Sequence, residues 1–307
     1  MKRLLIVSVI CIALIVPGIS HADNYARDYI PAPPGCLALL LYYLHVSADS
    51  LYHDGHKVAD GLDLNENIGL FRPIYFMEVG PFIIDPQMLI PFGQAQFDDN
   101  KADHDQLSAS GMGDPTVLAT FWFIHDTKSK TWLGFSPYFT FPIGDYDNNG
   151  ALSLGANRFA FKEELGFVKG FEVLPGHNAY FDLTLAGDFF MDNDEFGSHD
   201  QTLSQDPILT VESHLSYDVT QALFLSADYY YHWGGETSVN GIDGHDEQST
   251  HTVGMTMGLN IVPSVQVLFQ YKGDVDVDNG FAAQVFTFRF LYACDVGYLF
   301  GSPAAAK

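Results

Sequence analysis

Two neighbouring stretches between residues 207 and 233 alternate between a mainly polar and a mainly apolar parity, and this alternation limits the possible folds most. In the first stretch one parity carries Glu212 and His214, and the other carries Leu209 and Leu215. Because successive side chains of a β-strand point to opposite faces, a period of two predicts a strand with one polar and one apolar face. The pattern restarts after only three residues, 220–222, which predicts a tight hairpin.

These strands are too long for a soluble β-sandwich, whose strands usually have about five or six residues. The stretch from Leu223 to Trp233 covers roughly 33 Å along the strand and, at a tilt of about 45°, roughly 23 Å along the barrel normal. That height is close to the apolar band of an outer-membrane barrel. The apolar face would then contact lipid, and the polar face would line a watery lumen.

The start of the chain predicts export. Lys2 and Arg3 precede an apolar stretch that ends at Val16, and Ala22 ends an A-x-A-like cleavage site. This pattern is typical of a secretory signal peptide over residues 1–22. A retained anchor helix is the alternative, but the apolar stretch is shorter than the roughly 20 residues that span a bilayer.

The same period recurs along the chain and predicts twelve strands. They fall near residues 36–47, 64–78, 81–93, 114–125, 131–144, 156–171, 178–190, 207–219, 222–233, 250–262, 264–275 and 281–292. Their connections alternate between long and short, as in bacterial outer-membrane barrels, where the long loops are extracellular. If the N-terminus starts in the periplasm, every long connection, including residues 48–63, falls on the extracellular side.

We therefore expect an all-β fold, an antiparallel transmembrane β-barrel of about twelve strands over residues 36–293, in the outer membrane of a Gram-negative bacterium. Residues 23–35 would form a periplasmic lead, and residues 294–307 a periplasmic tail, so that both termini lie in the periplasm. One irregularity is expected at Glu163, which interrupts an otherwise apolar parity and predicts a bulge or a change of register.

The charge of the chain restricts its partners. A net charge of −24 argues against nucleic acid and against a basic membrane-surface patch. A hydrophobic content of 47% argues against a disordered acidic protein. The acidic residues concentrate in predicted loops, where they could hold divalent ions that bridge lipopolysaccharide phosphates or could simply be solvated.

No pattern predicts a metal site, a cofactor or a catalytic site. Asp145, Asp147 and Asn149 resemble the start of an EF-hand loop, but Ala156 stands where the bidentate Glu is required, which favours a polar hairpin loop. The twelve His residues show no closed ligand spacing. Adjacent residues of one strand point to opposite faces, so the Ser213 side chain cannot act as a nucleophile with its neighbour His214 as base.

The inward parity of the predicted strands carries both signs of charge. Its members are Tyr138, Arg158, Lys162, Glu164, Asp182, Asp188, Glu212, His214, Asp228, Tyr230, His232, Lys272 and Arg289. These side chains could close the lumen with hydrogen bonds and ion pairs, or they could line a narrow polar pore. The sequence leaves both possibilities open.

Cysteine usage suggests a cross-link. Cys11 leaves with the signal peptide, so Cys36 and Cys294 remain in an oxidising compartment. Closing the barrel brings the first and last strands together with both residues at the same rim. We therefore expect a disulfide between Cys36 and Cys294, with two unpaired thiols as the alternative.

Three motifs carry a family resemblance: SGMGDPTV at 110–117, FPIGDYD at 141–147 and LGANRFAF at 154–161. Together they make the chain, over roughly residues 62 to 292, resemble the outer-membrane family named for the meta-pathway of phenol degradation, whose members are often called transporters. The resemblance implies a barrel that passes small compounds, aromatic ones among them, and it implies no catalytic residues. A closed structural or adhesive barrel and an outer-membrane lipid-modifying enzyme are the alternatives.

Overall fold

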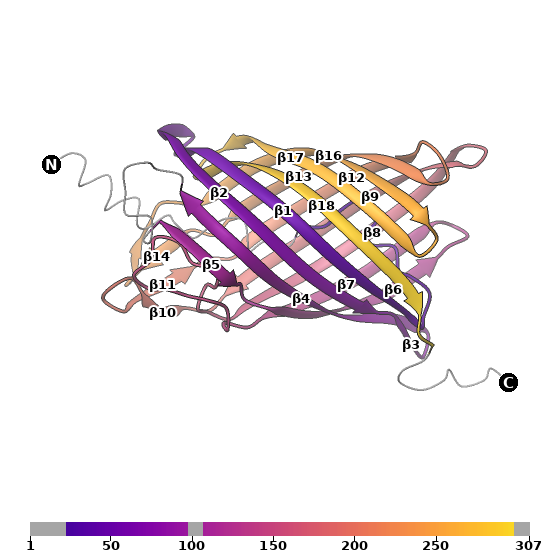
Figure 1. Cartoon of the computed structure of the whole chain (residues 1–307), viewed down its shortest axis with the longest axis horizontal. Helices are drawn as coiled ribbons and strands as arrows, with labels where there is room; N and C mark the ends of the chain where they lie inside the picture. Colours follow the sequence, from indigo (N-terminus) through magenta and orange to yellow (C-terminus); the bar gives the residue numbers. More distant parts are fainter. Residues whose placement is uncertain (1–22, 98–106, 298–307) are drawn as a thin grey trace.

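The computed structural model describes residues 23–97 and 107–297, which form one closed antiparallel β-barrel (Figure 1). Within these residues twelve long strands make the wall, as the alternation predicted. Their bounds are β1 (Cys36–His53), β2 (His56–Tyr75), β4 (Phe82–Phe97), β6 (Thr116–Asp126), β7 (Thr131–Thr140), β8 (Ala160–Leu174), β9 (His177–Phe190), β12 (Ile208–Asp218), β13 (Leu223–Gly234), β16 (Gln248–Val262), β17 (Val265–Val277) and β18 (Gly280–Asp295).

Six short strands accompany the wall. β3 (Met77–Val79) and β5 (Ser108–Met112) pair with β4, and β10 (Asn193–Phe196), β11 (Gln201–Gln205), β14 (Thr237–Val239) and β15 (Ile242–Asp243) form a separate small sheet. That sheet lies at one end of the barrel (Figure 1). Among the described residues no helix is long and apolar enough to cross a membrane.

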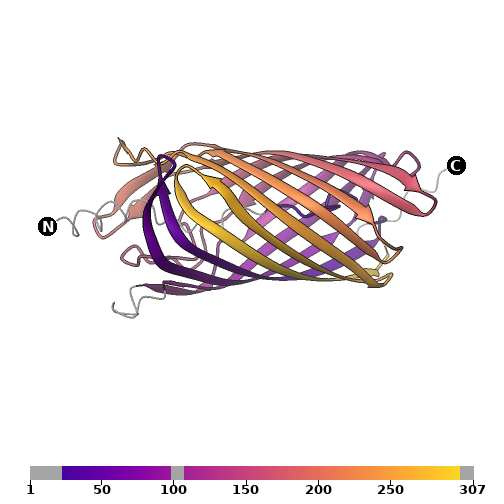
Figure 2. The ribbon, with the colours of Figure 1, turned by 90° about the horizontal axis from the view of Figure 1, so that it is seen from above.

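The sheet closes because β1 has a partner on each side. It pairs with β2 along one edge and with β18 along the other, from Cys36 opposite Asp295 to Tyr52 opposite Gly280. β2 pairs in turn with β4. Every long strand therefore has two antiparallel neighbours, and the strands run steeply tilted around the axis (Figure 2). Closure leaves no free sheet edge, which is what a β-structure in lipid requires.

The two faces of the wall follow the parity predicted from sequence. In β12 the His214 side chain is 1% exposed, whereas the next residue, Leu215, is 60% exposed. In β13 Asp228 is buried and Tyr229 is exposed. The polar parity thus faces the interior, and the apolar and aromatic parity forms the outer surface that would contact lipid.

The two ends of the barrel differ. At the terminal end, where β1 begins and β18 ends, short turns join the strands; the long segment 141–159 lies at the other end, the loop end. One predicted long loop is wrong: β1 continues to His53, and β2 begins at His56. Asp54 and Gly55 form the turn with φ of 50° and 69°, the left-handed pair that a two-residue Asp-Gly hairpin requires.

The irregularity expected at Glu163 is also wrong. Glu163 lies opposite Pro137 in β7 and Gly187 in β9 without a shift of register. Its side chain is exposed on the outer face of β8, a few residues from the loop end of the strand. A carboxylate so close to the rim can reach water, so no bulge is needed to turn it inward.

The structure confirms that the first and last strands are neighbours, but it does not contain the predicted disulfide. Cys36 and Cys294 are free thiols. The register places Cys36 opposite Asp295 and Leu37 opposite Cys294. Residues directly opposite each other share a face, so an offset of one residue turns the two thiols to opposite faces of the sheet.

Residues 23–35, predicted as a lead outside the barrel, instead run through its interior to the start of β1. Tyr25, Ala26 and Tyr29 belong to the buried core and pack with Tyr42, Trp122 and other wall residues. The alternation pattern could not place this segment, because it has no strand period. The predicted signal peptide, 1–22, and most of the predicted tail, 298–307, lie outside the described residues.

We predict that Cys36 and Cys294 stay unbonded. Non-reducing peptide mapping of protein exported to an oxidising periplasm should recover both residues alkylated. A matched control is Leu37→Cys in a Cys36→Ser background, which places a thiol directly opposite Cys294 and should form the cross-link. Recovery of a Cys36 to Cys294 peptide from the natural sequence would show that the register is different.

Candidate functional site: the barrel interior

Residues 23–32, here called the inner segment, lie in the lumen and line its terminal end together with Ala38, Phe76 and Ala293. The segment turns on itself, because the N–H of Asp28 donates to the carbonyl of Tyr25 at 3.0 Å and that of Ile30 to Arg27 at 3.2 Å. Side chains of the wall fill the interior of a barrel of about eight strands, whereas twelve strands leave additional space. The inner segment fills part of that space.

Glu212 of β12 holds the beginning of the inner segment. The backbone N–H and the side-chain Nδ2 of Asn24 both donate to Glu212 Oε2, each at 3.1 Å. The Tyr230 hydroxyl of β13 donates to the Asn24 carbonyl at 3.1 Å. A buried carboxylate without donors would be costly, so these contacts stabilise both the wall and the segment.

Arg27 binds the inner segment to β9 and β12. Its guanidinium pairs with Asp218 at 2.8 Å and donates to Ser216 at 2.9 Å, while its backbone N–H donates to Asp182. The charged group also stacks between Tyr180 and Phe224, with ring centroids at 4.4 and 4.1 Å. This combination of ion pair and cation–π contacts is typical of a well-ordered arginine.

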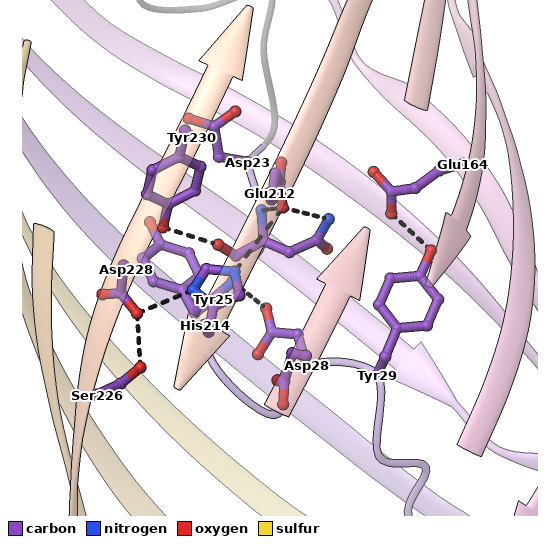
Figure 3. A network of polar contacts seen from close by, with 12 residues as sticks. Asp23, Tyr25, Asp28, Tyr29, Glu164, Glu212, His214, Ser226, Asp228 and Tyr230 are labelled. Carbon is purple, nitrogen blue, oxygen red and sulfur yellow. Dashed lines mark hydrogen bonds and ion pairs between the residues drawn. The ribbon is translucent and has the colours of Figure 1, made fainter. Parts of the chain in front are cut away.

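Tyr29 is the deepest aromatic side chain of the segment. Its hydroxyl donates to Glu164 Oε1 at 2.6 Å and lies 2.9 Å from the Ser136 hydroxyl (Figure 3). Its ring packs edge-on against Trp122, with centroids 5.6 Å apart. The ring also covers Gly166 of β8 so closely that a Cβ there would lie 2.3 Å from it.

Two further ion pairs complete the attachment. Arg289 of β18 pairs with Asp28 at 2.6 Å. Asp23 pairs with Lys272 of β17 and lies 3.3 Å from His232 of β13. The inner segment is therefore bound through side chains of both charges to β8, β9, β12, β13, β17 and β18.

The wall carries its own polar network between these contacts. Lys162 pairs with Glu164 at 2.9 Å, and His214 Nδ1 lies 2.9 Å from Asp228, which also accepts from Ser226 at 2.7 Å (Figure 3). The inward residues predicted from sequence all lie in the interior, buried except for the partly exposed Lys272. They are Tyr138, Arg158, Lys162, Glu164, Asp182, Asp188, Glu212, His214, Asp228, Tyr230, His232, Lys272 and Arg289.

The arrangement around His214 is not that of a nucleophile and base. Ser226 donates to Asp228 and not to His214, and Ser213 faces away from the lumen. Within residues 23–97 and 107–297 no group of three or more His, Cys, Asp or Glu side chains is arranged to hold a metal ion. The network can bind hydrogen-bonding groups.

Three cavities lie in the described part of the lumen, and the inner segment borders two of them. Two open toward the loop end: one of about 270 Å³ along β1 and β2, and one of about 630 Å³ beneath residues 141–159. The third, of about 350 Å³, lies toward the terminal end. Arg72, together with the inner segment, borders both the first and the third cavity, so these groups form the boundary between the two ends of the lumen.

The three family motifs meet at the loop end in one hydrogen-bonded cluster. The Asp114 carboxylate accepts the N–H of Gly144 at 2.8 Å and the N–H of Ala156 at 2.7 Å. Asp145 accepts the N–H of Met112 at 2.7 Å. Burial raises the pKa of Asp114 above its ordinary value, although these N–H groups act in the opposite direction.

This cluster explains the glycines of the motifs. A Cβ on Gly144 would lie 2.6 Å from the backbone of Gly113, so only glycine allows the chains to approach. The cluster holds segment 141–159 over the lumen, where Leu152 and Leu154 are buried against Leu64 and other residues of β1, β2 and β4.

The sequence did not identify several interior groups. Glu66, Arg72 and Asp85 lie in β2 and β4, where apolar residues occur on both parities, so the direction of these side chains could not be read. The residues of the inner segment were missed because they lack a period. The one available signal was composition, since two Tyr and one Arg within residues 23–32 are unusual for a solvated leader.

We predict that Gly166→Val displaces the inner segment. The new side chain would occupy the position of the Tyr29 ring, and losing the contacts of a buried aromatic side chain costs on the order of 3 kcal/mol. Single-channel recordings of the variant should show a clear rise in conductance. Gly187→Val is the matched control, because Gly187 faces outward and its nearest contact is at 3.4 Å. Equal conductance of both variants and the natural protein would contradict the prediction.

We predict that Asp114→Ala loosens segment 141–159. Two partly buried N–H groups would lose their acceptor, at a cost of about 1 kcal/mol. Limited proteolysis should then cut between residues 141 and 159 faster than in the natural protein, with Asp114→Asn intermediate. Asp126→Ala is the control, since Asp126 also accepts two backbone N–H groups but in an exposed turn at the terminal end. Unchanged cleavage in Asp114→Ala would refute the role of the cluster.

Comparison with known proteins agrees with this architecture. The structure is similar to that of an outer membrane channel from Pseudomonas putida F1, with 27% identity, a TM-score of 0.83, and coverage of 89% of this chain and 100% of that one. The translocator domain of the autotransporter NalP from Neisseria meningitidis is more distant, with 11% identity, a TM-score of 0.46, and coverage of 95% and 93%. No curated protein matches the sequence.

The fold is thus that of an outer-membrane channel. A family model matches residues 48–290, a range that contains all three motifs and most of the barrel. The resemblance predicted from the motifs is confirmed, and the chain belongs to the family described as "Putative MetA-pathway of phenol degradation".

Proposed function

We propose that the protein is a channel for passive passage of small, poorly charged or aromatic compounds across the outer membrane, and that it is not an enzyme. The observation that carries this proposal is the pair of spaces on either side of the inner segment. Cavities of about 270 and 350 Å³ meet at Arg72 and the inner segment, so these groups separate the two spaces along the lumen.

The lining of the lumen supports a solute with a mainly apolar body. On the side of β1 and β2 the first cavity is lined by Leu44, Val46, Leu64 and Ile68. On the other side it carries polar groups such as Thr252. An apolar molecule with one or two polar groups would find matching surfaces on both sides.

The inner segment favours one alternative, a closed structural or adhesive barrel. Its ion pairs and hydrogen bonds, among them Arg27 to Asp218 and Asp28 to Arg289, bind it to the wall. If these contacts never open, the barrel conducts nothing. The channel proposal therefore requires that the inner segment shifts or that solutes pass beside it.

In this proposal the barrel spans the outer membrane, both termini are periplasmic, and the acidic loops face lipopolysaccharide. Removal of residues 1–22 by signal peptidase would leave Asp23 as the first residue. Since Asp23 pairs with Lys272 inside the lumen, the mature chain would begin within the barrel.

We predict a small, cation-preferring conductance in planar bilayers. Among the described residues, buried carboxyl groups outnumber buried Lys and Arg side chains, so the lumen attracts cations more than anions. A KCl gradient should give a reversal potential of the sign expected for cations, and liposomes containing the protein should take up phenol faster than protein-free liposomes. A barrel that neither conducts nor speeds uptake would support the closed alternative.

A further inference from the structure

Among the described residues, Glu66 is a buried carboxyl group to which neither the wall nor the inner segment gives a hydrogen bond. It lies on β2 between Val46 of β1 and Ala95 of β4, and its side chain is 0% exposed. Neither carboxyl oxygen has a hydrogen-bond partner among the described residues. By contrast, Glu164 and Glu212 each accept bonds from the inner segment.

The carboxyl group faces a cavity and not a packed core. Glu66 lines the loop-end cavity of about 270 Å³, together with the apolar side chains of Val46, Ala48, Leu64 and Ile68. A cavity of about 150 Å³ in a protein core is known to hold benzene. The space beside Glu66 is therefore sufficient for a molecule with a single aromatic ring.

A buried acceptor without a donor is costly, and a ligand that brings one donor removes that cost. A hydroxyl group suits this position better than an ammonium group, because pairing an ammonium with a carboxylate here would require desolvation of both charges.

We propose that Glu66 is a binding residue for neutral, apolar molecules with one hydroxyl group, of which phenol is the simplest. The ring lies on the apolar side of the cavity, and the hydroxyl donates to a Glu66 carboxyl oxygen. A role of this site in the passage of solutes rests on the channel function proposed above. Binding itself does not depend on it.

The test is calorimetric titration of the full mature chain in detergent, with micelles alone as the blank, using phenol, toluene and benzylamine. Phenol should bind roughly tenfold more tightly than toluene, the effect of about one hydrogen bond formed away from water. Benzylamine should bind more weakly than phenol. This ranking uses only the natural protein, so it tests the site even if variants fail to fold.

Two variants then assign the effect to Glu66. Glu66→Leu should remove the advantage of phenol over toluene, with folding checked by the mobility of the unboiled protein on gels. Glu163→Leu is the matched control, because its carboxylate is exposed on the outer face of β8, and the ranking should stay unchanged. Equal binding of phenol and toluene, preference for benzylamine, or an unchanged ranking in Glu66→Leu would overturn the proposal.

Failure of the site and failure of the channel are distinguishable. If liposomes containing the protein take up phenol but phenol binding does not depend on Glu66, the channel function is supported and the Glu66 site is refuted. If the protein binds phenol through Glu66 but neither conducts ions nor speeds phenol uptake, the Glu66 site is supported and the channel function is refuted.

Discussion

When β1 pairs with β18, the last free edge of the sheet disappears, and the other features of the molecule follow from that closure. A β-structure in hydrocarbon must satisfy all its backbone groups within itself, and only a closed sheet does so. Closure also divides every strand into an outward and an inward parity, which is why Leu215 is exposed to the surroundings and His214 is enclosed. The inward parity places many polar side chains in the interior, and these side chains need hydrogen-bond or ion-pair partners.

The inner segment supplies those partners. Carboxylates of the wall at Glu212, Asp182 and Glu164 accept hydrogen bonds from Asn24, Arg27 and Tyr29. Held by these contacts, the inner segment has two effects. It stabilises a lumen that is too wide for its own side chains to fill, and it occupies the route that a solute would follow.

The lumen is also asymmetric. β8, β9, β12 and β13 present charged and hydrogen-bonded side chains, whereas β1, β2 and β4 present mainly aliphatic ones. The cluster formed by the three motifs holds Leu152 and Leu154 over the aliphatic side. On this side Asp85 accepts hydrogen bonds from Trp122 and Gln87, whereas neither oxygen of Glu66 has a hydrogen-bond partner among the described residues.

By itself the sequence determined the barrel, its twelve strands, the family and most inward residues. Period-two alternation is a local property: it appears in β12 and β13 wherever one face meets lipid and the other meets polar groups. The same rule failed where the two parities are alike, so Glu66 and Arg72 in β2 were not identified. It also missed the Asp54-Gly55 turn, because acidic and His residues around it resembled a loop.

Only the tertiary structure decided what fills the lumen and which groups meet at the seam. The inner segment has no period, and its place depends on contacts with strands that lie up to 262 residues away, as between Tyr25 and Thr287. Cys36 and Cys294 were correctly assigned to neighbouring strands, but an offset of one residue separates their side chains. Register between strands distant in sequence is set by closure of the whole sheet, which no local pattern encodes.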